Sequence, residues 1–230
     1  MNHAAERARK MVGRVQRHLR RKGVEAGVAG EILAVVDGSL ELRSGLVDDD
    51  HDHRLLHPAR TVLVLMDDAG VLDPSLLREG AALESRFPAF ALPASRRREL
   101  GLAEGPLLHL PTPDWNPGAG VGEESAEESR DGGVEESHGG GAPAEVDGDA
   151  DLLAELVSLD LPLLTVALAE ALDQVRHLHV EPGRPALRRG AVLVRDVYRP
   201  LAHRVDPGGV GLARRYDWWL RRVGRGALKG

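Results

Sequence analysis

Apolar residues recur at steps of three and four along most of the chain, the spacing that places them on one face of a helix. The first such stripe runs through residues 4–22 and leaves arginines on the opposite face. We therefore predict an N-terminal helix there. Residues 27–34 fit a helix or a turn, and residues 36–45 fit a short helix or a short strand.

Two prolines mark the starts of the next helices. Proline is favoured at the first helical position, where its missing N–H would have had no partner within the helix. His57-Pro58 therefore predicts a helix that ends near Gly70. Asp73-Pro74 predicts a second helix with Asp73 as its N-cap. We expect these two helices to form a hairpin.

The second half of the chain contains the most regular helical pattern. After Pro162, residues 164–178 carry apolar side chains at helical spacing, which predicts a strong amphipathic helix. Further helices are predicted over residues 93–100, 152–157, 185–204 and 210–223. The apolar residues are mostly Leu, Val and Ala, which suits helix packing better than a β-sandwich. The predicted fold class is all-α.

Charge divides the chain into three parts. Residues 118–150 contain ten acidic residues and a single basic one, Arg130, so this tract carries −9. The net charge of the chain is −6, which leaves +3 on the rest. A block of like charge repels itself and cannot build a core. We therefore expect 118–150 to be a disordered acidic insert, open to a protein partner, between the two halves of one domain, 1–117 and 151–230.

Composition and the basic N-terminus exclude several classes of protein. The chain has no Cys, so disulfides, thiolate zinc sites and cysteine nucleophiles are absent. No apolar stretch follows the N-terminal arginines, so we expect no membrane partner and a cytoplasmic location. The arginine face would suit a nucleic acid, but charge on an outer helix face is more often simply solvated. Nucleic acid is therefore not the expected partner.

Four segments carry a resemblance to a known family. They are His57-Pro58 with the apolar helix that follows, residues 73–85, the string LAEALDQVRHL at 168–178 and the string YRPLAHR at 198–204. In this order they resemble the HD-domain phosphohydrolases, particularly the (p)ppGpp hydrolases of the RelA/SpoT and metazoan SpoT-homologue type. The resemblance covers about residues 50–220 with the acidic tract as an insertion. It implies an HD-domain-like helical bundle.

The resemblance also implies a (p)ppGpp 3'-pyrophosphohydrolase in which a divalent ion, manganese, activates water. Leu83-Glu84 or Glu84-Ser85 stands where the family has its His-Asp pair, and Glu170 stands where it has Asp. The metal ligands that this implies are Glu84 and Glu170 together with His51, His53 or His57. The residues that it implies for binding a guanine nucleotide or another phosphoester are Arg176, Tyr198 and Arg204.

Two functions follow from this pattern. An enzyme would use these ligands for hydrolysis, whereas a non-catalytic descendant would keep the fold as a nucleotide-binding or protein-interaction module. The missing His-Asp pair favours the pseudoenzyme, and no catalytic residue is assigned. The alternative to a metal site is that Glu84 and Glu170 face solvent or pair with arginines. Residues 48–53 equally fit a solvated acidic turn before a helix.

Two further groups of residues have simpler interpretations. His177 lies near the end of the predicted helix 164–178, where positive charge suits the helix dipole, so we expect it to cap that helix. The aromatic residues of the run Tyr216-Asp217-Trp218-Trp219 have the composition of a stacking platform. In a chain with few aromatic residues we expect them instead to anchor the last helix on the core.

Overall fold

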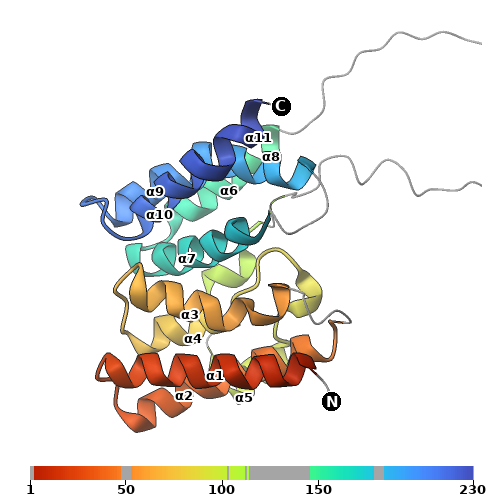
Figure 1. The fold of residues 1–230 in the computed structure, drawn as a ribbon, viewed down its shortest axis with the longest axis vertical. Helices are drawn as coiled ribbons and strands as arrows, with labels where there is room; N and C mark the ends of the chain where they lie inside the picture. The colour runs from red at the N-terminus through yellow and green to blue at the C-terminus, as the bar shows by residue number, and fades with distance from the viewer. Residues whose placement is uncertain are drawn as a thin grey trace, which may run out of the picture.

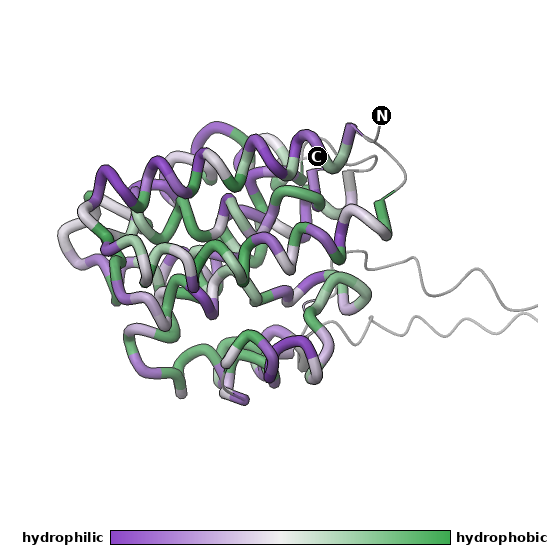
Figure 2. Tube along the Cα trace, turned by 90° about the horizontal axis from the view of Figure 1, so that it is seen from below, coloured by the Kyte–Doolittle hydropathy of each residue, from purple (hydrophilic) through white to green (hydrophobic). Residues whose placement is uncertain are grey.

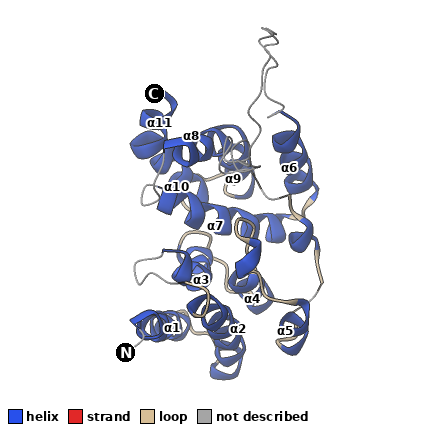
Figure 3. Cartoon of the chain, turned by 90° about the vertical axis from the view of Figure 1, so that its right-hand side faces the viewer, coloured by secondary structure: helices blue, strands red, loops and turns tan. Residues whose placement is uncertain are grey.

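The structure is a computed structural model that describes residues 3–47, 53–102, 104–111, 113, 146–178 and 184–229. Within these ranges all regular structure is helical (Figure 3), which confirms the predicted all-α class. The predicted acidic insert lies outside the described residues up to position 145. Its last residues, from 146 onward, belong to a helix.

The N-terminal layer is a pair of packed helices, α1 (His3–Arg21) and α2 (Ala26–Ser44). The first agrees with the predicted N-terminal helix. The second resolves the ambiguous pattern at 27–45, because Ile32, Val36 and Leu40 recur every four residues and all three are buried. Val35 and Ser39 are buried with them. A helix places all five on one face, whereas a strand would turn Val35 and Ser39 to the opposite face.

The predicted hairpin forms α3 (His57–Asp67) and α4 (Pro74–Ala82), which pack against each other. Asp73 caps α4 as expected, since its side chain accepts a hydrogen bond from the backbone N–H of Leu76 at 3.1 Å. A short 3-10 turn, η1 (His53–Leu56), leads into α3. The start of α3 is thereby held next to the end of α2.

Short elements fill the proline-rich region after α4. They are η2 (Pro88–Phe90), α5 (Ala94–Glu99) and η3 (Pro106–His109). Both 3-10 turns begin at a proline, whose fixed φ and missing N–H suit the first position of a turn but not the interior of a long helix. The region therefore covers the core with short segments.

The helix α7 (Leu161–His177) lies in the middle of the molecule (Figure 1). It packs against α3 and α4 on one side and against α9 and α10 on the other. The preceding helix α6 (Val146–Ser158) begins earlier than the predicted 152–157, inside the predicted insert. Asp149 in its second turn pairs with Arg189 of α8, with Arg189 Nη1 at 2.6 Å. That long-range pair could not be read from local charge.

Two helical runs in the C-terminal part contain a π-helical turn. The first is α8 (Arg184–Leu193), η6 (Val194–Tyr198) and α9 (Arg199–Val205). The second is α10 (Leu212–Trp219), η7 (Leu220–Gly224) and α11 (Arg225–Lys229). In the first run Pro200 has no N–H for an α-helical bond, and the N–H of Arg199 reaches Val194 O instead. The predicted helix over 185–204 is therefore continuous but locally widened.

The buried apolar side chains form one continuous core that runs from α1 to α10. Hydrophobic and hydrophilic positions alternate along the individual helices (Figure 2), as one-sided burial requires. None of the described helices is both long enough and apolar enough to cross a membrane. The two halves of the sequence thus contribute to the same core.

Candidate functional site

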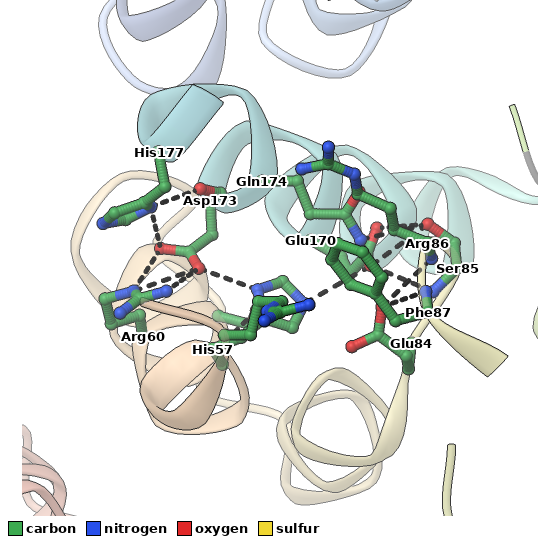
Figure 4. Close-up of polar contacts among 12 residues, drawn as sticks. His57, Arg60, Glu84, Ser85, Arg86, Phe87, Glu170, Asp173, Gln174 and His177 are labelled. Carbon is green, nitrogen blue, oxygen red and sulfur yellow. Dashed lines mark hydrogen bonds and ion pairs between the residues drawn. The ribbon is translucent and has the colours of Figure 1, made fainter. Parts of the chain in front are cut away.

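Charged side chains from three helices, α2, α3 and α7, and from the segment after α4 meet in the interior. Figure 4 shows the side chains of α3, of α7 and of the segment after α4 pointing toward one another. The charged members of this buried cluster are Arg43, His57, Arg60, Glu84, Glu170 and Asp173. Ser85 and Gln174 join it through hydrogen bonds. The sequence folds this way locally because Pro58 starts α3 beside His57, and α4 ends just before Glu84.

Asp173 binds two cations of α3. Its Oδ2 lies 2.7 Å from Nδ1 of His57. Arg60 donates from Nε to Oδ1 at 2.9 Å and from Nη2 to Oδ2 at 3.0 Å. The same Nη2 donates to the carbonyl oxygen of His53 at 2.7 Å. This fork of parallel bonds is the strongest arrangement that Arg makes with a carboxylate.

Glu170 lies on the other side of the His57 ring. Its Oε1 is 3.3 Å from Nε2 of His57. Ser85 donates to the same carboxylate from its backbone N–H at 3.1 Å and from its hydroxyl at 2.9 Å. The side-chain amide of Gln174 also donates to Oε1. The imidazole of His57 is thus held between two carboxylates.

Glu84 is fully engaged as well. It forms an ion pair with Arg43, and its Oε1 accepts the backbone N–H groups of Arg86 at 3.0 Å and Phe87 at 2.9 Å. Arg43 also donates to the carbonyl oxygen of Arg54 at 2.9 Å. Both members of the pair are almost completely buried. Removing either would leave an uncompensated charge in the interior.

The protonation states of its residues make the positive and negative charges of the cluster equal in number. Burial by itself lowers the pKa of His57, but its hydrogen bond to Asp173 and the nearby Glu170 carboxylate outweigh burial and raise the pKa to about 9. Burial raises the pKa of Asp173, yet Arg60 and His57 outweigh it and leave that pKa well below its usual range. Near neutral pH, three cations (Arg43, His57, Arg60) therefore face three carboxylates (Glu84, Glu170, Asp173).

Part of the predicted metal set is brought together, but its donor atoms are already engaged. Glu84, Glu170 and His57 converge, and both ring nitrogens of His57 face carboxylates, so the protonated ring has no lone pair for a metal. In the part of the chain that the structure describes, no group of three or more His, Cys, Asp or Glu is arranged to hold an ion. The residues as placed do not fit a divalent metal.

The other two predicted histidine ligands do not complete the set. His51 lies outside the described residues. His53 stacks on His177, with ring centroids 5.6 Å apart and planes inclined by 6°. His177 Nδ1 donates to the carbonyl oxygen of Asp173 at 2.7 Å, in the last turn of α7. Burial and the charge of Arg60 lower the pKa of His177, so it caps the helix as a neutral ring rather than as the cation that we expected.

A cavity of about 10 Å³ opens beside the cluster, lined by Arg43, His53, Arg54, His57, Arg60, Glu84, Arg86, Phe87, Asp173 and Gln174. Such a volume holds roughly one water molecule. The guanidinium groups of Arg54 and Arg86 lie 5.1 and 4.7 Å from the ring centre of Phe87. A nucleotide cannot enter this space, so a large ligand would contact only its rim.

The predicted nucleotide-binding residues point elsewhere. Arg176 donates to Asp68 at 3.1 Å, and Arg204 donates to the carbonyl oxygen of Val157 at 3.4 Å. Tyr198 is 4% exposed, and burial raises its pKa well above the usual value. A tyrosine packed in the core presents no surface to a nucleotide.

Arg43, Arg60 and Asp173 were not singled out in the sequence, although they are central to the cluster. Two of them carried a usable signal. Asp173 lies three residues after Glu170 on an otherwise apolar helix, and Arg60 lies three residues after His57 on another. Paired polar positions on a buried face indicate mutual contact across helices. Arg43 carried no such signal.

No family model matches the chain, and no curated protein or solved structure matches it either. The chemistry of the cluster is therefore inferred from its own geometry.

Proposed function

We propose that this chain is a non-catalytic binding module on an HD-domain-like helical fold, in which a buried ion-pair cluster stands in place of a hydrolase metal centre. The HD-like part of the proposal is supported by spatial convergence. His57, Glu84-Ser85 and Glu170 come from three separate segments that carry the family resemblance, and they lie in direct contact. Contact among these positions is what a metal centre of the HD type would require of the fold.

The balance of charge in the cluster is the main observation in favour of a metal-free site. A divalent ion supplies two positive charges to the carboxylates around it. Here Arg43 and protonated His57 supply two positive charges to Glu84 and Glu170. The carboxylates are neutralised and hydrogen-bonded without a metal, so an incoming cation would have to displace a buried guanidinium.

The protonation states argue against hydrolysis by the cluster itself. A general base works best with a pKa near the working pH. The pKa of Glu84 is lowered: burial would raise it, but the charges of His57 and Arg43 prevail. The pKa of Asp173 is lowered as well, by Arg60 and His57. His57, with a pKa of about 9, is protonated and cannot accept a proton near neutral pH. Glu84, Asp173 and His57 are therefore poorly suited to activate water as general bases.

The experiment that tests this proposal is manganese-dependent stabilisation of wild type and Arg43→Ala. Removing the guanidinium leaves Glu84 and Glu170 with excess negative charge. We expect no shift in melting temperature with manganese for wild type, and a concentration-dependent rise for Arg43→Ala. Arg97→Ala is the control, because Arg97 is also buried and pairs with a carboxylate outside the cluster, Glu79, at 2.9 Å.

The outcomes separate the two functions. Stoichiometric manganese binding by wild type, together with release of pyrophosphate from (p)ppGpp, would overturn the proposal and establish a hydrolase. A manganese effect of equal size in the Arg97→Ala control would indicate general electrostatic binding instead. If Arg43→Ala is too unstable to purify, Arg43→Met keeps the packing volume and removes the charge.

A guanine nucleotide at the rim of the cavity is the second candidate ligand. The observation that favours it is the stack of Arg54 and Arg86 on Phe87, which puts aromatic and cationic surface together beside the cluster. Calorimetric titration of (p)ppGpp into wild type and Phe87→Ala tests it. Binding that weakens in the variant supports the rim as the site, and unchanged binding excludes it.

A further inference from the structure

The run Tyr216-Asp217-Trp218-Trp219 on α10 divides between core and surface. Tyr216 is fully buried and its hydroxyl donates to the carbonyl oxygen of Leu168 at 2.6 Å. Trp219 is 2% exposed, so these two residues anchor α10 as expected. Trp218, in contrast, is 52% exposed. The anchoring function therefore leaves the indole of Trp218 unexplained.

Exposed arginines flank Trp218 along the helix. Arg214 precedes it by four residues, Arg221 and Arg222 follow it by three and four, and all are exposed. Residues at these spacings lie next to one another on a helix surface. Trp218 with Arg214, Arg221 and Arg222 is called here the Trp218 stripe.

Within the described ranges, neighbouring arginines are paired with acidic side chains, whereas those of the Trp218 stripe are not. Arg199 pairs with Asp217 at 2.6 Å, and Arg215 pairs with Asp68 at 2.7 Å. Among the described residues, the guanidinium groups of the stripe form no ion pair. The surrounding segment is also basic, since residues 184–229 contain eleven Arg and one Lys against three Asp. An anionic partner is the complement of such a surface.

We propose that the Trp218 stripe binds single-stranded nucleic acid. Proteins that bind single strands combine a cationic track for the phosphates with an exposed aromatic ring on which a base stacks. The stripe supplies both, and its cations are all Arg, whose planar fork binds phosphate in a bidentate manner. This inference is independent of the buried cluster and of its proposed function.

The chemistry of the stripe favours this partner over a membrane surface. A helix that lies in a membrane interface presents a broad apolar face. The apolar residues of α10 other than Trp218 are buried or half-buried, so no such face is exposed. An acidic peptide would satisfy the arginines but would leave the indole without a role.

The other basic surface of the molecule serves as a control. Arg14, Arg17, His18, Arg20 and Arg21 line a groove on α1. This groove has no aromatic lining residue, and α1 lies at the opposite end of the molecule from α10 and α11 (Figure 1). Removing the same number of arginines from α1 and from the stripe therefore distinguishes binding of nucleic acid at the stripe from general electrostatic attraction.

The test is fluorescence anisotropy of labelled twenty-nucleotide strands, dT and rU, with the full chain at several salt concentrations. We expect Trp218→Ala to weaken binding about tenfold, because base stacking on the indole is lost. Arg214→Gln with Arg222→Gln should reduce the log–log salt slope by about 1.4, since each phosphate contact releases about 0.7 counterions. Arg17→Gln with Arg20→Gln should change neither quantity.

Several outcomes would overturn the proposal. Absence of binding at low salt would do so, as would equal affinity of wild type and Trp218→Ala. Stronger binding to phosphatidylserine vesicles than to either strand would assign the stripe to a membrane, and equal binding of polyglutamate would reduce it to cation exchange. Comparison of dT with rU distinguishes DNA from RNA as the source of the strand. Trp218 is exposed, so the variant should keep the melting temperature of wild type.

Discussion

His57 is fully buried between two carboxylates, and this makes the stability of the fold depend on pH. Its pKa is 6.5 for an unperturbed ring and about 9 in the fold. Between these values the folded state binds more protons than the unfolded state, so stability falls as pH rises. We expect the full contribution, about 3 kcal/mol, below pH 6.5 and its loss as pH approaches 9. Urea unfolding at intervals across this range measures it.

The control for this prediction is His57→Gln. This variant should be less stable than wild type near pH 6 and should lose most of the decline between pH 6.5 and 9. Its acid limb should shrink but remain, because Arg43 and Arg60 still lower the pKa values of Glu84 and Asp173 while the effect of His57 on them is lost. These lowered pKa values stabilise the fold above about pH 4, and the effect is lost as the carboxylates protonate. An unchanged alkaline decline in the variant would assign it to other groups. Tyr198 and Tyr216, with raised pKa values, act only above pH 10.

At the scale of the element, we predict opposite effects on stability for Gly→Ala substitutions at two glycines inside helices. A Cβ on Gly80 of α4 would overlap Leu65 Cδ1 of α3 and lie 3.5 Å from Thr61 Cγ2, whereas a Cβ on the exposed Gly30 of α2 meets nothing within 4 Å. Gly80→Ala should therefore lower the free energy of unfolding by roughly 1–2 kcal/mol after its gain in helix propensity. Gly30→Ala should raise it by up to about 1 kcal/mol.

Chemical unfolding of both glycine variants against wild type provides the measurement. Stabilisation by both substitutions would mean that the Leu65 side chain yields to the added methyl group. Destabilisation by both would mean that α2 needs Gly30 for a reason other than space. The predicted difference in sign comes from the close approach of α3 and α4, which also positions His57 and Glu84 at the cluster.

At the scale of the whole molecule, the two halves of the sequence form one core. The helix α7 packs on α3 and α4 as well as on α9 and α10. Asp68, just after α3, pairs with Arg176 of α7 at 3.1 Å and with Arg215 of α10 at 2.7 Å. Neither half can bury its apolar surface without the other. The fold should therefore unfold as a single cooperative unit.

This prediction is tested by following urea unfolding with two signals. Far-ultraviolet circular dichroism reports on all helices. In a Trp115→Phe variant, tryptophan fluorescence reports on the C-terminal half through Trp218 and the buried Trp219. We expect the two transitions to coincide. A fluorescence transition at a different urea concentration would show that residues on the two sides of the acidic tract form separate folding units.

The sequence by itself determined the helical class and most helix starts. These depend on local physics: apolar periodicity, proline at the first position of a helix, and a cap such as Asp73, all of which act within a few residues. The same local signals did not decide between helix, turn and strand for residues 27–45. In that segment the buried face is defined by the helices that pack against it. The local signals also missed the first turns of α6, whose Asp149 has its partner in α8.

The tertiary structure alone decided what the polar residues of the core do. Glu84 and Glu170 were identified in the sequence, but their partners could not be, since Arg43 is 41 residues from Glu84 and Ser85 is 85 residues from Glu170. His57 and Asp173 are separated by 116 residues. A carboxylate binds a metal or an arginine according to which cation the fold places beside it. That choice depends on helix packing, which brings distant segments together and which local residue patterns do not encode.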